Sequence, residues 1–171
     1  AYDLNKLAIV PSAGGPSRLL TEALDRPVSG PILWTGDGKT LTFTVADDRV
    51  VYAGRTTTAG GTVERLTSGR RTVSNLSPGP DGAFAVLAGT ATELVEVFAL
   101  ERAGLRRLSR QNDPLLAELQ LATTEDITST SKDGTVVNGL MVKPASYTAG
   151  TKFPTLLIVH GGPNGQDQHS F

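Results

Sequence analysis

The sequence has no cysteine, two histidines, one tryptophan and one methionine. Without cysteine the chain cannot form disulfides, use a thiolate as nucleophile or build a cysteine zinc site, and its redox compartment stays open. The two histidines, His160 and His169, are too few for a histidine-rich metal site. We therefore expect neither a metal nor any other cofactor.

The chain also lacks an excess of either charge and a long apolar run. Sixteen basic residues face 17 acidic ones, for a formal net charge of −1. Neither nucleic acid nor a membrane is therefore expected as a partner. The longest apolar run, residues 156–159, is far too short to cross a bilayer. These features predict a soluble protein, with the cytoplasm favoured over the periplasm.

The 171 residues can bury one good core or parts of two. They begin at Ala1-Tyr2-Asp3, without a methionine or a signal-like segment. We expect a piece of a longer polypeptide that continues beyond both ends.

Glycine is abundant, and its turns mark a repeat. Four features recur in one order at steps of 42 to 47 positions: a turn of small residues and glycine, an Arg-Leu pair, a Val-Ser pair, and an Asp-Gly turn. The glycine turns are Ala13-Gly14-Gly15, Ala59-Gly60-Gly61 and Arg102-Ala103-Gly104; the Arg-Leu pairs are Arg18-Leu19, Arg65-Leu66 and Arg107-Leu108; the Val-Ser pairs are Val28-Ser29 and Val73-Ser74; the Asp-Gly turns are Asp37-Gly38 and Asp81-Gly82.

A period of about 40–45 residues built from short strands is typical of β-propeller blades. One unit is predicted to hold four antiparallel strands, at residues 73–77, 84–88, 93–100 and 105–109. A single four-stranded sheet leaves both faces exposed, so blades must stack. Residues 1–116 are predicted to form about two blades and part of a third. The alternative is a β-sandwich in which the spacing is accidental.

The blade pattern stops after residue 111. Asp113 before Pro114, followed by helix-forming residues, predicts a short helix with Asp113 as its N-cap. A hairpin is predicted at residues 126–131 and 135–143, followed by a buried apolar strand at residues 155–159. The boundary between two domains is placed near residue 117.

The predicted strand runs into His160-Gly161-Gly162-Pro163. Enzymes of acyl transfer hold an oxyanion with preorganised donors, usually backbone amides, and a glycine pair lets the chain approach the substrate closely. Gly162 is the candidate donor through its amide, with Gly161 shaping the loop and Pro163 stiffening its exit. The alternative is a plain tight turn after a core strand. His160 is interpreted as a residue that fixes the loop by hydrogen bonding.

A complete catalytic set is missing from the sequence. No serine lies in Gly-x-Ser-x-Gly, and a Ser…Asp…His order cannot be built because both histidines lie beside the candidate loop. The sequence has no phosphate-binding loop and no calcium loop. His169 supports no inference, and Asp37, Asp47, Asp48 and Asp81 are interpreted as turn residues.

In this order the segments resemble the prolyl oligopeptidase family of serine peptidases, in its acylaminoacyl- and dipeptidyl-peptidase-like branch. The resemblance is carried by the segments 34–39, 59–67, 112–119, 131–144 and 153–165. It implies a mostly β chain: the last blades of a β-propeller in residues 1–116, then the first strands of an α/β-hydrolase domain in residues 117–171.

The resemblance also implies what the parent enzyme does. It would cleave short peptides through an acyl-enzyme, with its serine, aspartate and histidine outside this chain, which is expected to be inactive alone. Besides peptide substrates, the expected partner is the remainder of the polypeptide or another copy. Two alternatives stay open. One is a non-catalytic propeller that binds or scaffolds other proteins, and the other is a lipase-like esterase, which would not explain the repeats.

Overall fold

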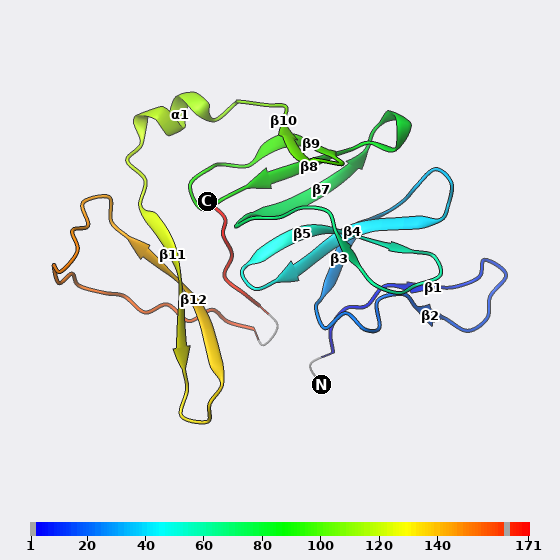
Figure 1. Ribbon diagram of the computed structural model, residues 1–171, viewed down its shortest axis with the longest axis horizontal. Helices are drawn as coiled ribbons and strands as arrows, with labels where there is room; N and C mark the ends of the chain where they lie inside the picture. Colours follow the sequence, from blue (N-terminus) through cyan, green and yellow to red (C-terminus); the bar gives the residue numbers. More distant parts are fainter. Residues whose placement is uncertain (1–2, 163–164) are drawn as a thin grey trace.

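The computed structural model describes residues 3–162 and 165–171, except for the side chain of Asp81 (Figure 1). Almost all regular structure in it is antiparallel β. The first blade contains β3 (Val28–Trp34), β4 (Thr40–Asp47), β5 (Val50–Thr57) and β6 (Glu64–Arg65); the second contains β7 (Thr72–Pro78), the short 3-10 helix η1 (Pro80–Gly82), β8 (Phe84–Gly89), β9 (Glu96–Glu101) and β10 (Gly104–Arg107). Consecutive strands pair within each blade, which confirms the predicted four-stranded units.

A two-stranded hairpin precedes the first blade. It consists of β1 (Ala8–Ile9) and β2 (Arg18–Leu19), and its connection contains the first glycine turn of the repeat. The corresponding turns join β5 to β6 and β9 to β10. By the position of its glycine turn, the hairpin corresponds to the outer half of a blade. The two complete blades are joined by one parallel bridge, between Val51 and Thr72.

The repeated Val-Ser pair marks an irregularity in the first strand of each blade. The register between β3 and β4 shifts after Ser29, and that between β7 and β8 shifts after Ser74. In the second blade the shift contains Asn75, a non-glycine residue with a φ of 49°. Such bulges bend and twist a strand locally. The equivalence of the two sites explains why these short motifs recur 45 positions apart.

Each unit closes with a leucine followed by a hydroxyl residue. The Leu20, Leu66 and Leu108 amides each donate at 2.8 Å to a carbonyl of an adjacent strand or segment, on Leu7, Ala53 and Val97 respectively. In return, the amide of each of these acceptor residues donates to the hydroxyl of the residue that follows the closing leucine. The hydroxyls are those of Thr21 at 2.9 Å, Thr67 at 3.0 Å and Ser109 at 2.8 Å.

This closure corrects one part of the predicted repeat. Leu20, and not Leu19, is the structural equivalent of Leu66 and Leu108, because one additional residue lies between Arg18 and the closing leucine. The Arg-Leu match at Arg18 is therefore shifted by one residue, whereas the other two matches hold.

Two separate cores fill the spaces on either side of the first blade. One lies between β1–β2 and the first blade and contains Phe43, Val45 and Tyr52 among its buried residues. The other lies between the two blades and contains Ala53, Val73 and Val86. Strand β4 is buried on both faces, with Leu41, Phe43 and Val45 alternating with Thr42 and Thr44.

The chain leaves the second blade through a short helix, α1 (Asp113–Glu118). Its N-cap is Asn112 and not Asp113, so the predicted cap is off by one residue. The amide nitrogens of Asn112 are bonded to the buried carboxylate of Glu96, and Asp113 pairs with Arg107 and Arg110 from inside the first turn. The carboxylate of Asp113 suits the positive end of the helix dipole. No helix of the described residues is long and apolar enough to cross a membrane.

The hairpin predicted after the helix is confirmed. It consists of β11 (Thr123–Thr130) and β12 (Val136–Lys143), which pair over their full length. The prediction of a buried strand at residues 155–159 is wrong: this segment forms no strand, and Leu156, Leu157, Ile158 and Val159 are 80–89% exposed. A strand of a parallel sheet needs neighbours on both sides, and the described residues place none beside this segment.

Candidate active site

The candidate oxyanion loop lies at the surface, where the extended segment 151–160 ends. Gly162 has a φ of 79°, in the region that favours glycine. Its carbonyl accepts a hydrogen bond from the Gly165 amide at 3.4 Å. Within the described parts of the chain, no acceptor is bonded to the Gly162 amide, which can therefore donate to an oxygen from outside. Pro163, to which the sequence gives the role of stiffening the loop exit, lies outside the described residues.

His160 contacts the same loop. Its Nδ1 lies 3.3 Å from the carbonyl oxygen of Gly161, so the Nδ1–H tautomer can donate to it. This agrees with the interpretation of His160 as a residue that fixes the loop. Gly165 also packs closely here, since a Cβ atom at this position would lie 3.0 Å from the Gly161 carbonyl oxygen.

The segment after the loop returns to the first blade and binds the turn between β4 and β5. The Arg49 amide donates to Oε1 of Gln166 at 3.2 Å, and Nε2 of Gln166 donates to the Val50 carbonyl at 3.1 Å. The His169 amide donates to the Arg49 carbonyl at 2.8 Å. Three hydrogen bonds thus join Gln166 and His169 to two consecutive residues of the blade that lie more than 110 positions earlier in the sequence.

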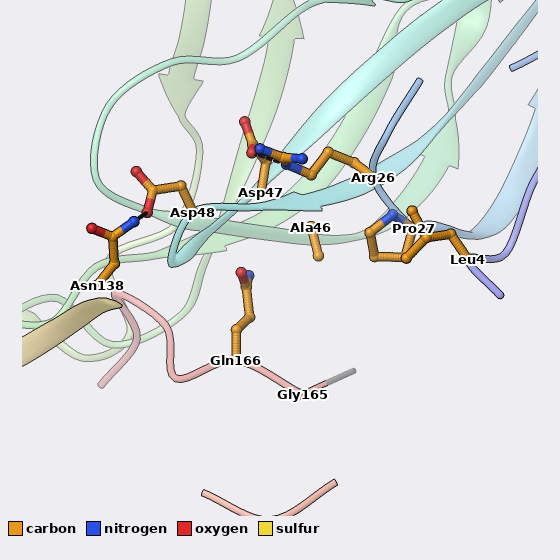
Figure 2. A pocket seen from close by; sticks show the side chains of 9 residues that line it. All are labelled: Leu4, Arg26, Pro27, Ala46, Asp47, Asp48, Asn138, Gly165 and Gln166. Carbon is orange, nitrogen blue, oxygen red and sulfur yellow. Dashed lines mark hydrogen bonds and ion pairs between the residues drawn. The ribbon is translucent and has the colours of Figure 1, made fainter. Parts of the chain in front are cut away.

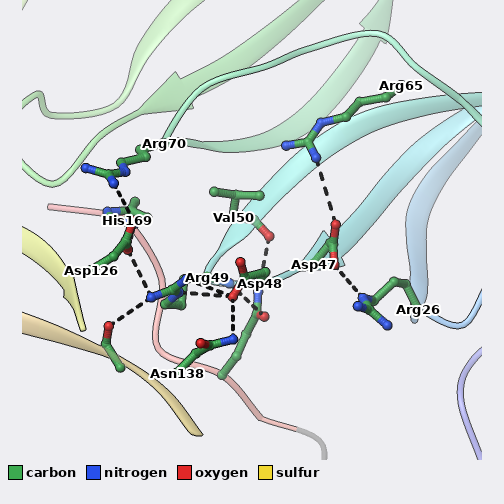
Figure 3. A network of polar contacts seen from close by, with 12 residues as sticks. Arg26, Asp47, Asp48, Arg49, Val50, Arg65, Arg70, Asp126, Asn138 and His169 are labelled. Atoms are coloured by element: carbon green, nitrogen blue, oxygen red, sulfur yellow. Dashed lines mark hydrogen bonds and ion pairs between the residues drawn. The ribbon is translucent and has the colours of Figure 1, made fainter. Parts of the chain in front are cut away.

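Asp126 on β11 connects four parts of the fold (Figure 3). Its carboxylate is 3.1 Å from Nη1 of Arg49, 2.7 Å from Nη2 of Arg70 and 2.8 Å from Nε2 of His169. Burial raises the pKa of Asp126, but the hydrogen bond from His169 and the charges of Arg49 and Arg70 outweigh it, so that the pKa lies below its ordinary value of 3.8. Asp126 is therefore a carboxylate at neutral pH.

A cleft of about 650 Å³ opens between the first blade and the segment that follows the loop (Figure 2). Asp47 and Arg26 line it from the blade, and Gln166 lines it from the other side. The Arg26 guanidinium donates a hydrogen bond to the Asp47 carboxylate, which raises the pKa of Arg26 above its ordinary value. A smaller cleft of about 220 Å³ next to it includes Asp48 and His160 in its lining. Polar groups of both signs thus lie close to the candidate loop.

No protein-family model matches the chain. Over 66 residues it is 32% identical to the uncharacterized peptidase YuxL of Bacillus subtilis, a stretch that covers 39% of this chain and 10% of the relative. An acylaminoacyl peptidase solved in complex with Z-Gly-Gly-Phe-chloromethyl ketone superposes with a TM-score of 0.76 at 20% identity, covering 92% of this chain and 24% of that one. In fold, this chain resembles an acylaminoacyl peptidase.

The β-propeller domain of the Trilobed protease from Pyrococcus furiosus, described as having an open velcro topology, is also similar. It has a TM-score of 0.53 and 26% identity, with coverage of 68% of this chain and 33% of that one. The likeness supports propeller blades over a β-sandwich. This chain spans between a tenth and a third of the length of these three relatives.

The resemblance to acylaminoacyl peptidases predicted from the sequence is thus confirmed for the fold, whereas an α/β-hydrolase part is not formed by the described residues. Gly161 and Gly162 lie together in an exposed loop, and their catalytic role stays a prediction. Sequence reasoning missed Arg49, Asp126 and His169. A signal for Arg49 was present in the sequence, because Asp48 and Arg49 separate two β-rich runs and are the two residues of a tight hairpin turn.

No metal-binding group of three or more His, Cys, Asp or Glu occurs in the described part of the chain.

Proposed function

We propose that this chain is part of a serine peptidase of the prolyl oligopeptidase family. The proposed reaction is cleavage of short peptides by acyl-enzyme hydrolysis, as in acylaminoacyl or dipeptidyl peptidases. One observation carries the proposal: blades, short helix, hairpin and Gly-Gly loop follow one another in a chain of which 92% is covered by an acylaminoacyl peptidase. Residues 1–116 alone could not account for 92% of the chain, so the superposition also includes residues from 117–171. This supports residues 117–171 as the start of the peptidase domain.

The chemistry assigned to this chain is stabilisation of charge. When a serine attacks a peptide carbonyl, negative charge develops on the carbonyl oxygen, and preorganised N–H donors lower the barrier. The Gly162 amide is the proposed donor, and Gly161 allows a close approach because it has no side chain. The serine, aspartate and histidine are proposed to lie outside this chain, which is inactive alone. The blades cover the site and limit the size of the substrate.

A second candidate function is a non-catalytic propeller that binds other proteins. It is favoured by the exposed segment before the loop, since residues 156–159 pair with no strand in the described ranges. In this case the Gly-Gly turn has no catalytic role.

The test uses the complete polypeptide encoded by the gene, a serine-reactive fluorophosphonate and a series of acylated and free peptide p-nitroanilides. The peptidase proposal predicts one adduct by intact mass, outside residues 1–171, and release of p-nitroaniline. Gly162→Ala keeps the amide N–H but strains a backbone with a φ of 79°, so the donor is displaced from the oxyanion. It should lower kcat by up to about 100-fold, because a misplacement of about 1 Å has effects of this size.

The matched control is Gly150→Ala. Gly150 also has a positive φ, of 85°, and no atom within 4 Å of a Cβ placed there, so both substitutions strain an open loop alike. Equal effects of the two substitutions would reject the role of Gly162. No adduct and no hydrolysis in the unaltered polypeptide would reject the peptidase and favour the binding protein.

A further inference from the structure

The turn between β4 and β5 has an unfavourable backbone for its sequence. Asp48 and Arg49 have φ values of 45° and 68°. A two-residue hairpin turn with positive φ at both positions is of type I′, in which glycine is preferred at the second. A non-glycine residue held in this region is strained, and such strain points to a role for the side chain. The question is therefore what the arginine at position 49 does that glycine could not.

The Arg49 side chain joins the blade to the hairpin β11–β12. Its Nη1 donates to the Gly139 carbonyl at 3.0 Å and lies 3.1 Å from Asp126, and its Nη2 lies 2.9 Å from Asp48. The side chain is only 12% exposed, and that of His169, which binds the same carboxylate, is 4% exposed. Partly buried ion pairs with additional hydrogen bonds hold their geometry far better than solvated surface pairs.

The same turn holds the chain that leaves the candidate oxyanion loop. The backbone of residues 49 and 50 is bonded to Gln166 and His169, while Asp126 fixes the His169 ring. Gly165, one residue before Gln166, is bonded to Gly162 and packs against the Gly161 carbonyl. A continuous set of contacts therefore leads from the Arg49 turn to the two glycines.

We propose that the β4–β5 turn is a clamp through which the propeller positions the oxyanion loop, with Arg49, Asp126 and His169 as its positioning residues. The inference deepens the proposed function and rests on it. A donor must lie within a few tenths of an ångström of the developing oxyanion to act fully. Because the loop itself is exposed, its precision comes from the clamp on the chain that follows it. The propeller then contributes to the chemical step, besides limiting access.

The test compares Arg49→Gly, Asp126→Asn and the control Arg106→Ala in the complete polypeptide. Arg49→Gly removes the side chain while relieving the strain of the turn, so that the hairpin is retained. Arg106 forms an exposed pair with Glu101 on the second blade, and its replacement removes the same charge. The readouts are hydrogen exchange of residues 165–171, the kcat and KM for the best p-nitroanilide, and the Ki of the matching peptide boronic acid.

We expect faster exchange of residues 165–171 and a kcat lowered roughly 10- to 100-fold in both clamp variants, since misplacement by about 1 Å has effects of this size. KM should stay within twofold. The Ki of the boronic acid, which mimics the tetrahedral state, should rise in parallel with the loss of kcat/KM. Arg106→Ala should leave all readouts unchanged.

Unchanged exchange in the clamp variants would overturn the clamp, and faster exchange with unchanged kcat and Ki would overturn its positioning role. If the unaltered polypeptide shows neither hydrolysis nor fluorophosphonate labelling, the proposed function fails, and the positioning role fails with it. The exchange data would still decide whether the clamp exists, so the two failures are distinguishable.

Discussion

Replacing Thr67 by valine should weaken the closure of the first blade. The Thr67 hydroxyl accepts the amide of Ala53 at 3.0 Å; Thr67 is 5% exposed and Ala53 is fully buried. Valine has nearly the same shape, so no cavity forms, but the Ala53 amide loses its acceptor in a place that water does not reach. An orphaned buried donor costs about 1–3 kcal/mol. The added buried methyl group offsets less than about 1 kcal/mol of this, which leaves a net loss of about 1–2 kcal/mol.

Native-state hydrogen exchange of β5 measures this loss directly in the complete polypeptide. A loss of about 1–2 kcal/mol corresponds to exchange that is roughly 5- to 30-fold faster when the amides exchange through local opening. Thr67→Ser keeps the hydroxyl and should retain most of the protection. Thr128→Val alters an exposed threonine on β11 and serves as the control for the change in residue type. The reasoning is refuted if the amides of β5 exchange at the same rate in the Thr67→Val and Thr128→Val variants.

Three further predictions test other parts of the structure. Phe43→Ala, at a fully buried site, should lower the free energy of unfolding by about 3–5 kcal/mol in urea denaturation, and a loss under about 1 kcal/mol would contradict the described core. Hydrogen bonds from Ser109 and Asn112 lower the pKa of Glu96 from its ordinary 4.5 to about 2. The unfolded chain therefore binds this proton more readily, so the stabilisation is complete above pH 4.5 and is lost as the pH falls toward 2. Glu96→Gln should flatten the dependence of Tm on pH in this window, and an unchanged slope would argue against the assignment. Gly165→Ala should reduce kcat because its Cβ presses on the Gly161 carbonyl, whereas Gly36→Ala, where a Cβ meets no atom within 4 Å, should not; equal rates would show that this contact is not needed.

The blades could be predicted because their information is local. Glycine turns and alternating residues recur at a fixed spacing, and the strands of the second blade form within a few residues of their predicted bounds. The closing hydroxyl residues Thr21, Thr67 and Ser109 could have been found by aligning the same repeats. They were missed because one additional residue before Leu20 shifts the first match.

The clamp could not be predicted, because its three positioning residues come from segments that no local pattern connects. Asp126 is one acidic residue of a hairpin until the fold brings Arg49, Arg70 and His169 to it. The error at residues 155–159 has the opposite origin. An apolar run predicts burial from its composition alone, but burial requires neighbouring strands, and the described residues do not contain them.

The single bridge between Val51 and Thr72 has a consequence for how the blades come apart. With one backbone pair at the joint, the blades are coupled through the side chains of the second core and scarcely through a shared ladder. Each boundary between units has its own core, so the energetics are those of nearest neighbours in a linear array. Losing the second blade would leave the core between β1–β2 and the first blade intact. The two boundaries can therefore open one at a time, and a substitution in one core acts mainly on its own boundary.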